Sequence, residues 1–368
     1  MKTIVFVTSQ IAPFQVEFAA AMNDIADVRY HVIFTGKENK RPPHWLDLND
    51  KIAKFSSIAP NTSPNENATK DWAIKHVREL NPDAVLIGGV RGMAFNIGQA
   101  YRRESRVPVG LWMEPPLRKT NPAHKLLRRI DYKWRLKKVD FIFAIGDRAH
   151  HYYRGCNPNT HFVPYGADLK VCLDLPLPKP RGDKTKFLFS GGLHERHNFP
   201  VIMAGFKNLL DSRGPCFEII ISGDGPEQKV IDAAIKETPV LGGLIRYERT
   251  FSGWSERLNP FLESHVFIYP TNHAGWGLVV PEAMASGNLV ISTDGAESAR
   301  YLISNEINGV FIKPNIEEFS TALLRCIDDR EWVENLGLAA RFSAKRGHAS
   351  YVSEQLMNAL RIASNGRV

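Results

Sequence analysis

The chain has 368 residues, of which 43% are hydrophobic and 23% charged, as expected for a globular protein with a full core and two domains. Its formal net charge of +8 points to anionic partners such as phosphates, nucleic acid or an acidic membrane, unless the charge is simply spread over the surface. Four cysteines without CxxC spacing argue against a disulfide framework or a cysteine metal site. No apolar run reaches the roughly eighteen residues of a membrane-spanning helix.

The first half of the chain alternates short apolar runs with amphipathic stretches. The apolar runs predict strands at 3–8, 30–36, 84–89, 107–114 and 140–146, and the amphipathic stretches predict helices at 13–25, 67–80, 96–105 and 125–139. Strands that alternate with helices indicate a mostly parallel sheet covered by helices on both faces. The apolar run near the start of the chain is too short for the core of a secretory leader and fits a buried first strand. The cysteine pattern fits a reducing compartment, and we expect a cytoplasmic protein.

The second half repeats the same alternation after a stretch rich in proline and charge. Strands are predicted at 186–192, 216–225, 244–248, 265–270 and 288–293, and helices at 198–210, 226–236, 254–264, 278–287, 316–329 and 330–346. The sequence therefore predicts an α/β protein with two doubly wound domains, at 1–170 and 187–345, a linker at 171–186, and a C-terminal segment, 346–368, whose helix can pack back on the first domain. We expect the ligand site between the two domains, beyond the carboxyl ends of the strands.

The loop SGGLHERHN, residues 190–198, follows the first strand of the second domain. Gly191 and Gly192 allow the backbone to approach a ligand, while Arg196 and His197 can meet an anion. The same residues are also consistent with a glycine turn that carries solvated charges. The next strand ends in SGDGPE, residues 222–227, where Gly223 can serve a ligand or a plain turn.

The stretch HAGWGLVVPEAMASGN, residues 273–288, combines two glycines with the start of a helix. Gly275 and Gly277 leave the backbone bare beside helix N–H groups, which favours a phosphate. Glu282, in the first helical turn, can accept hydrogen bonds from the two hydroxyls of a ribose, although a carboxylate there also stabilises the helix by itself. On the ribose interpretation, Glu282→Ala abolishes nucleotide binding with little loss of fold.

Four motifs occur in an order and at spacings that resemble the donor domain of the family 4 glycosyltransferases, which have the GT-B fold: FSGGLHERHN, IIISGDGPE, VFIYPTNHAGWGLVVPEAMASGNLVIST and NGVFIKP. The resemblance covers about residues 185–345, and extends more loosely to the first half through NPDAVLIGG, FIFAIGDRAHHYY and VPYGAD. It implies transfer of a sugar from a nucleotide sugar to an acceptor, usually with retention and without a metal, and the chain has no DxD-type ligand pair.

The resemblance also implies a set of donor-site residues in the 273–282 region. Glu282 corresponds to the glutamate that holds the ribose, and backbone next to the glycines faces the diphosphate. The implied donor-binding set comprises Gly191, Gly192, Gly223, His273, Ala274, Gly275, Trp276, Gly277, Leu278, Val279 and Glu282.

The chain departs from the family pattern at three of these positions. Gly192 stands where the family has a phosphate-binding arginine, and His197 stands where it has a lysine. Ala274 replaces the family's first glutamate, so a contact to the donor sugar is missing unless a neighbour such as His273 supplies it. Stabilisation of the leaving diphosphate then depends on Arg196 or on a protonated His197.

Strand ends of the first domain are expected to hold the acceptor. Glu114 follows one of these strands and can contact the transferred sugar or take the proton of the acceptor, with a simple loop carboxylate as the alternative. Arg91 and Arg118 are candidates for an acceptor phosphate, or solvated surface arginines. The predicted catalytic set is Glu114, Arg196 and His197.

Residues 118–138 contain nine Lys or Arg and one acid, Asp131. Their apolar residues recur at helical spacing, at Leu126, Leu127, Ile130 and Trp134. This pattern favours a basic amphipathic helix that rests on an anionic membrane, or else a core-packing helix with a solvated basic face. Nucleic acid is not expected as a partner, because no nucleic-acid-binding motif is present.

The sequence therefore predicts a metal-independent, hexosyltransferase-type glycosyltransferase of cell-surface polysaccharide or glycolipid synthesis. Its nucleotide sugar is a substrate, and no separate cofactor is expected. It would be cytoplasmic and peripheral on the inner face of the membrane, with a glycan or lipid-linked acceptor. Two alternatives stay open: a non-catalytic GT-B subunit that keeps nucleotide affinity, and an enzyme similar to nucleotide-sugar epimerases.

Overall fold

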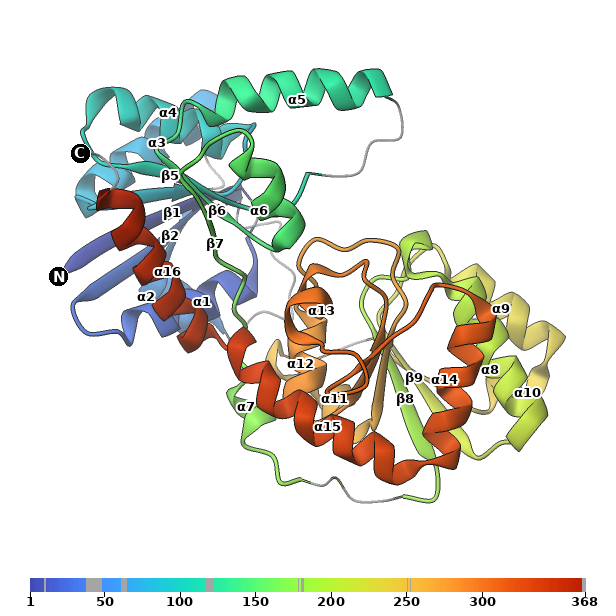
Figure 1. Ribbon diagram of the computed structural model, residues 1–368. Coiled ribbons are helices and arrows are strands. Elements are labelled where there is room, and N and C mark those ends of the chain that lie inside the picture. The colour runs from blue at the N-terminus through green and yellow to red at the C-terminus, as the bar shows by residue number, and fades with distance from the viewer. Residues whose placement is uncertain are drawn as a thin grey trace. The chain divides into compact units, whose positions relative to one another are not determined.

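The computed structural model describes residues 1–9, 11–37, 48–60, 65–116, 122–177, 179, 182–249, 251 and 253–365 (Figure 1). The chain forms two compact units. Unit 1 comprises Met1–Asp168 and Ala349–Val368, and unit 2 comprises Leu169–His348.

Unit 1 is built on a parallel sheet with strand order β3-β2-β1-β4-β5-β6-β7. Its strands are β1 (Lys2–Thr8), β2 (Val28–Lys37), β3 (Ser56–Ala59), β4 (Ala84–Ile87), β5 (Val109–Met113), β6 (Phe141–Ala144) and β7 (Thr160–Phe162). Its helices are α1 (Pro13–Asn23), α2 (Asn49–Phe55), α3 (Glu66–Leu80), α4 (Met93–Glu104), α5 (Pro122–Leu136), α6 (Asp147–Arg154) and α16 (Ala349–Asn365).

Both faces of this sheet are buried, which explains why its strands read as continuous apolar runs. On one face, Val5 and Val85 belong to a core that also includes Ala73 of α3 and Ile97 of α4. On the other face, Phe6 packs against the ring of Trp112, and α1 lies beside α16.

Unit 2 has a parallel sheet with strand order β10-β9-β8-β11-β12-β13. Its strands are β8 (Thr185–Ser190), β9 (Phe217–Ser222), β10 (Ile245–Glu248), β11 (Val266–Tyr269), β12 (Leu289–Ser292) and β13 (Val310–Phe311). Its helices are α7 (Lys170–Leu173), α8 (Phe199–Arg213), α9 (Gln228–Glu237), α10 (Pro239–Gly242), α11 (Asn259–Glu263), α12 (Val279–Ala285), α13 (Glu297–Leu302), α14 (Ile316–Asp328) and α15 (Arg330–Ala344), with short 3-10 turns at Glu195–His197, Ser255–Leu258 and Lys345–Gly347.

In chain order within unit 2, this sheet runs 3-2-1-4-5-6, the doubly wound Rossmann arrangement, and unit 1 has the same order with one more strand. The predicted fold class, GT-B with two Rossmann-like domains, is confirmed. No helix in the described part of the chain is both long and apolar enough to cross a membrane.

The stretch 171–186 was predicted as a linker, but its described residues belong to unit 2. Arg341 of α15 donates hydrogen bonds to the carbonyl oxygens of Leu173 and Leu175. The Nζ atom of Lys179 donates to the carbonyl oxygens of Phe261 (2.7 Å) and Ser264 (2.6 Å). The described part of 171–186 is therefore hydrogen-bonded to the rest of unit 2 despite the content of proline and charged residues in this stretch.

Candidate functional site

Three loops meet where the strand order of unit 2 reverses, between β8 and β11. They are 191–198 after β8, 223–227 after β9 and 270–278 after β11. The N–H of Leu193 donates to the carbonyl of Asp224 (2.7 Å), and the N–H of Asn272 donates to the carbonyl of Arg196 (2.7 Å). The carboxyl ends of the strands at such a switch point are where doubly wound sheets bind ligands.

Close approach of backbone explains one glycine of these loops, and a neighbouring ring crowds another. Gly223 has φ +136°, and a Cβ there would lie 2.2 Å from the carbonyl oxygen of Gly191. A Cβ on Gly192 would lie 2.6 Å from Nε2 of His194, so the imidazole ring occupies the space that a side chain at position 192 would enter. The three loops therefore form one backbone-rich surface.

The 273–279 stretch leads into α12 and is tied to the start of α13. The N–H of Ala274 donates to the carbonyl of Gly295 (3.0 Å), and Ser298 Oγ donates to the carbonyl of Gly277 (2.8 Å). His273, Ala274, Gly275, Gly277, Leu278 and Val279 are all partly exposed. Gly277 has φ +84°, a backbone conformation that favours glycine.

Trp276 does not fit its predicted place among the ligand contacts. Its side chain is 1% exposed and its ring lies 5.8 Å from the ring of Tyr301. Only its backbone, whose carbonyl accepts from the N–H of Ser298, lies in the loop surface. The aromatic side chain at this position is therefore a packing residue of unit 2.

Glu282 lies in the first turn of α12, as predicted, but its side chain is buried and ion-paired. Its Oε1 accepts a hydrogen bond from Nη2 of Arg257 (3.0 Å), and the Glu282 side chain is 7% exposed. Arg257 also donates to the carbonyl of Trp254 (2.9 Å), and its guanidinium lies 3.8 Å from the centre of that ring. We therefore replace the expectation that Glu282→Ala leaves the fold almost intact with the prediction that it destabilises unit 2, because it removes the carboxylate that is paired with a largely buried arginine.

Two opposing effects set the pKa of Glu282. Burial raises it, Arg257 lowers it, and the net result is a pKa above the ordinary value. A carboxylate has about four lone-pair sites, so the bond from Arg257 leaves acceptor capacity for a ligand.

His197 is a neutral hydrogen-bond acceptor rather than a cation. It is 1% exposed, and its ring lies 5.1 Å from the ring of Tyr269. Burial, and then the neighbouring charges of Arg196, His194 and His273, lower its pKa to about 3. Of the two sources of positive charge considered for this loop, Arg196 and a protonated His197, only Arg196 is then available at neutral pH.

Arg196 provides the exposed cation of the same loop. Its Nε donates to Nε2 of His197 (3.2 Å), so the ring proton of His197 lies on Nδ1. Among the described residues, Arg196 forms no ion pair with a carboxylate. Its guanidinium thus keeps its positive charge available to an anion.

The residues predicted on the acceptor side lie in unit 1. Glu114 is exposed and follows β5, and its carbonyl accepts from the hydroxyl of Tyr153 (2.7 Å). Arg91 is not free for a phosphate, because its Nη2 bonds Oδ2 of Asp131 (2.7 Å). Arg118 lies outside the described residues.

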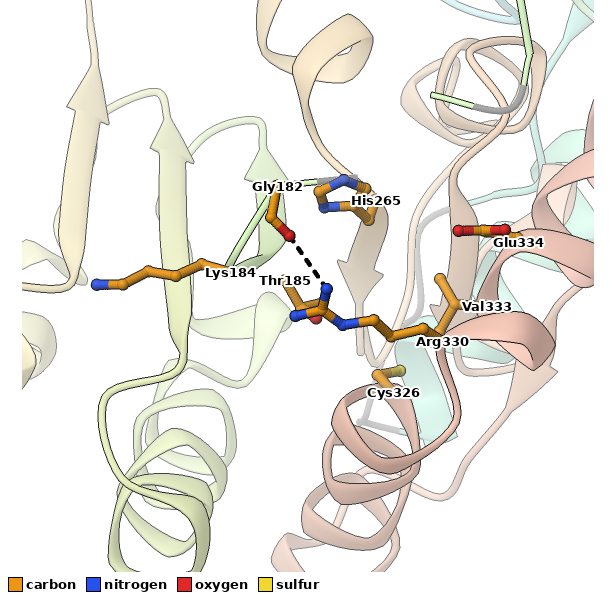
Figure 2. Close-up of a pocket in the computed structure, with 8 residues that line it drawn as sticks. All are labelled: Gly182, Lys184, Thr185, His265, Cys326, Arg330, Val333 and Glu334. Carbon is orange, nitrogen blue, oxygen red and sulfur yellow. Dashed lines mark hydrogen bonds between the residues drawn. The ribbon is translucent and has the colours of Figure 1, made fainter. Parts of the chain in front are cut away.

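No sequence signal identifies Arg257, because it pairs with Glu282 across 25 residues of chain and belongs to no motif. In the described part of the chain, no group of three His, Cys, Asp or Glu side chains is placed to hold a metal. A small cavity beside α15, shown in Figure 2, lies elsewhere in unit 2. It is lined by Thr185 at the first residue of β8 and by His265 just before β11, at the amino ends of these strands, so it is not part of the candidate site.

Residues 177–342 match the family model for glycosyl transferases group 1, a range that contains all three loops and α12. Over 214 residues the chain is 27% identical to a phosphatidyl-myo-inositol mannosyltransferase of Mycolicibacterium smegmatis, covering 56% of this chain and 53% of that protein. Over 167 residues it is 26% identical to the lipopolysaccharide core biosynthesis glycosyltransferase LpsE of Rhizobium meliloti, covering 42% and 45%. The chain thus spans about half the length of these curated relatives.

Among solved structures, the chain is similar to HepE of Anabaena in complex with UDP. The TM-score is 0.73 at 14% sequence identity, and the match covers 98% of this chain and 100% of HepE. A likeness at this level of identity concerns the fold.

Proposed function

We propose that the protein is a glycosyltransferase that moves a sugar from a nucleoside-diphosphate sugar to a glycan or lipid-linked acceptor, with retention and without a metal. One observation carries the proposal: three glycine-containing loops are hydrogen-bonded together at the switch point of unit 2, within the segment that matches the glycosyl transferases group 1 model. The relatives act in mannosyl transfer and in lipopolysaccharide core biosynthesis, which supports a role in polysaccharide or glycolipid synthesis.

In this proposal the residues of unit 2 bind the donor. Glu282, oriented by Arg257, accepts hydrogen bonds from the ribose hydroxyls. N–H groups of Leu278 and Val279, which precede the first hydrogen bond of α12, face the diphosphate. Arg196 supplies the positive charge that stabilises the leaving diphosphate, because His197 is neutral.

The acceptor belongs to unit 1 in the same proposal. Glu114 is exposed at the carboxyl end of β5, where a carboxylate can take the proton of an attacking hydroxyl. A lipid-linked acceptor would place the enzyme at the inner face of a membrane, and α5 is the element through which we expect it to bind there.

The first test is a thermal-shift panel with UDP, GDP, ADP, CMP, dTDP and their sugar conjugates. UDP is the first ligand to test, since HepE was solved with it. A ligand at a hundred times its Kd adds about 2.7 kcal/mol to the free energy of unfolding, enough for a shift of several degrees. No shift with any nucleotide would contradict the donor-site assignment.

Turnover separates this proposal from its two alternatives. Donor-dependent release of nucleotide in the presence of a membrane extract is expected of the transferase. Because Ala274 and Gly192 depart from the family pattern, a non-catalytic subunit is the main competitor, and it would bind nucleotide without turnover. An epimerase-like enzyme would convert or hydrolyse the nucleotide sugar without any acceptor.

A further inference from the structure

Helix α5 carries an apolar stripe that the described part of the chain does not cover. Four large apolar side chains are more than half exposed: Leu126 (60%), Leu127 (64%), Ile130 (59%) and Trp134 (58%). At about 100° per residue they fall within an arc of about 100° on one side of the helix. Figure 1 shows α5 at the margin of unit 1, with its N-terminal half extending past the neighbouring helices of that unit.

Cations flank this stripe. Arg129 and Lys133 are exposed and follow the stripe along one edge of the helix. Beyond the helix end, Nζ of Lys138 lies 3.0 Å from the centre of the Trp134 ring. Side chains of this kind can reach past an apolar surface to place their charge in a polar layer.

Asp131, the acid of this helix, is neutralised on the side away from Arg129 and Lys133. Oδ2 of Asp131 accepts from Arg91 (2.7 Å) and Oδ1 accepts from Arg135 (2.8 Å). Partial burial raises the pKa of Asp131, but the hydrogen bonds from Arg135 and Arg91 outweigh it, so the carboxylate stays ionised and paired at neutral pH. The stripe is therefore bordered on one edge by Arg129 and Lys133, which form no ion pair within the described part of the chain.

The C-terminal end of α5 packs against unit 1 through residues outside the apolar stripe. The helix is therefore held in place without burial of the stripe. Leu136 is fully buried in the core, and the side chain of Asn157 donates to the carbonyl oxygen of Leu136 (3.0 Å). Tyr132 packs on the ring of Tyr153. The helix thus has an inner face that holds it and a separate outer face.

We infer that the outer face of α5 binds an anionic lipid bilayer, with Leu126, Leu127, Ile130 and Trp134 inserted at the interface and Arg129 and Lys133 at the lipid phosphates. An apolar stripe between cations matches a surface that is negative at its headgroups and apolar beneath them. Nucleic acid offers the negative charge without the apolar layer, and so leaves the four exposed side chains unexplained.

Lipid binding by α5 is independent of the proposed function, but its relevance to the acceptor residue Glu114 rests on that function. The hydroxyl of Tyr153, whose ring packs on Tyr132 of α5, donates to the carbonyl of Glu114 (2.7 Å). These contacts connect the inner face of α5 to the proposed acceptor residue, so docking of α5 would fix the side of unit 1 that carries Glu114 relative to the lipid surface. Lipid binding itself requires neither donor nor turnover.

The test is cosedimentation of the full chain with vesicles of phosphatidylcholine alone or with phosphatidylglycerol, at low and high salt. Binding is expected only with phosphatidylglycerol. Arg129→Glu/Lys133→Glu should weaken it about thirtyfold or more, since each cation near an anionic surface contributes roughly fivefold. Leu127→Ser/Ile130→Ser should weaken it roughly tenfold or more at the same charge. All four positions are exposed, so unchanged thermal unfolding should accompany these losses.

Controls of equal chemistry are provided by other helices, α3, α9 and α15. Lys75→Glu/Lys229→Glu matches the charge reversal, and Phe342→Ser removes a side chain that is 75% exposed on α15; both should bind like the wild type. Brominated lipid should quench fluorescence in the wild type more than in Trp134→Phe, which reports insertion.

Four results would overturn the inference. One is full binding by either α5 double variant. Another is a loss of vesicle binding on charge reversal, combined with unchanged binding by Leu127→Ser/Ile130→Ser and no quenching by brominated lipid. That combination would indicate electrostatic adsorption without insertion. The others are binding to nucleic acid but not to vesicles, and a dimer that Leu127→Ser/Ile130→Ser dissociates, which makes the face a contact between copies. Nucleotide thermal shifts measured on the same variants show separately whether the donor site is intact.

Discussion

Replacing Glu282 with alanine should destabilise unit 2, whether or not Glu282 also binds the nucleotide. The Glu282 and Arg257 side chains are 7% and 14% exposed, and the bond between them is 3.0 Å long. Breaking a buried ion pair on one side costs about 3–5 kcal/mol, and the partial exposure of Arg257 places Glu282→Ala near the lower end. For a unit of this size, about 3 kcal/mol corresponds to a fall in Tm of roughly 6–12 °C.

Calorimetry on Glu282→Ala, Arg257→Met and Glu282→Met/Arg257→Met tests this estimate. The double variant leaves no charge uncompensated, so we expect it to recover most of the stability that either single change loses. A loss below about 2 °C for Glu282→Ala, or a double variant that is as unstable as the two single losses added together, would refute the buried pair. Glu282→Gln keeps the shape of the side chain. Weaker nucleotide binding by this variant, measured at a temperature at which it is still folded, would then report the loss of the ribose contact.

Three further outcomes follow from charges in unit 2. His197 is neutral in the folded chain down to about pH 3, whereas a histidine in the unfolded chain takes up a proton near pH 6.5. The free energy of unfolding should therefore fall as the pH is lowered from 6.5 to 3, and His197→Gln should reduce this fall in an acid-unfolding series. Burial lowers the pKa of Lys179 from 10.5 to about 7, so the free energy of unfolding should rise between pH 7 and pH 10.5, by at most about 5 kcal/mol. In urea titrations at a series of pH values, Lys179→Met should remove this pH dependence. Arg196→Gln should weaken the binding of a nucleoside diphosphate at least tenfold in calorimetric titration but weaken the binding of the nucleoside little. Equal losses for both ligands would remove Arg196 from the phosphate site.

The alternation of strands and helices was readable from the sequence because parallel sheets bury both faces and leave apolar runs. The elements that were missed are short or depend on distant partners. β3, at Ser56–Ala59, is a four-residue edge strand, and β13, at Val310–Phe311, has two residues, so neither carries a periodic pattern. The segment that includes Lys179 is fastened to unit 2 by contacts to α11, and proline content alone cannot reveal such contacts.

The candidate site was predictable as far as it depends on backbone. Glycines mark places where chains approach closely, and the distance from Gly223 to the carbonyl of Gly191 is the physical reason for one of them. The state of the side chains was not predictable in the same way. Trp276 and His197 occupy motif positions, yet both are buried, and burial depends on packing partners elsewhere in unit 2.

The departures from the family pattern take on a different meaning once the side chains are placed. A histidine in place of a lysine could have kept the charge at position 197, but burial among Tyr269, Arg196 and two other histidines removes it. The positive charge of this loop therefore rests on Arg196, one residue earlier, whose guanidinium is held by the neutral ring. A buried cation at 197 would cost desolvation energy, whereas Arg196 is exposed to solvent beside a neutral acceptor. The cation of this loop therefore lies at the surface, and in the proposed transferase the stabilisation of the leaving group by Arg196 should not depend on histidine titration.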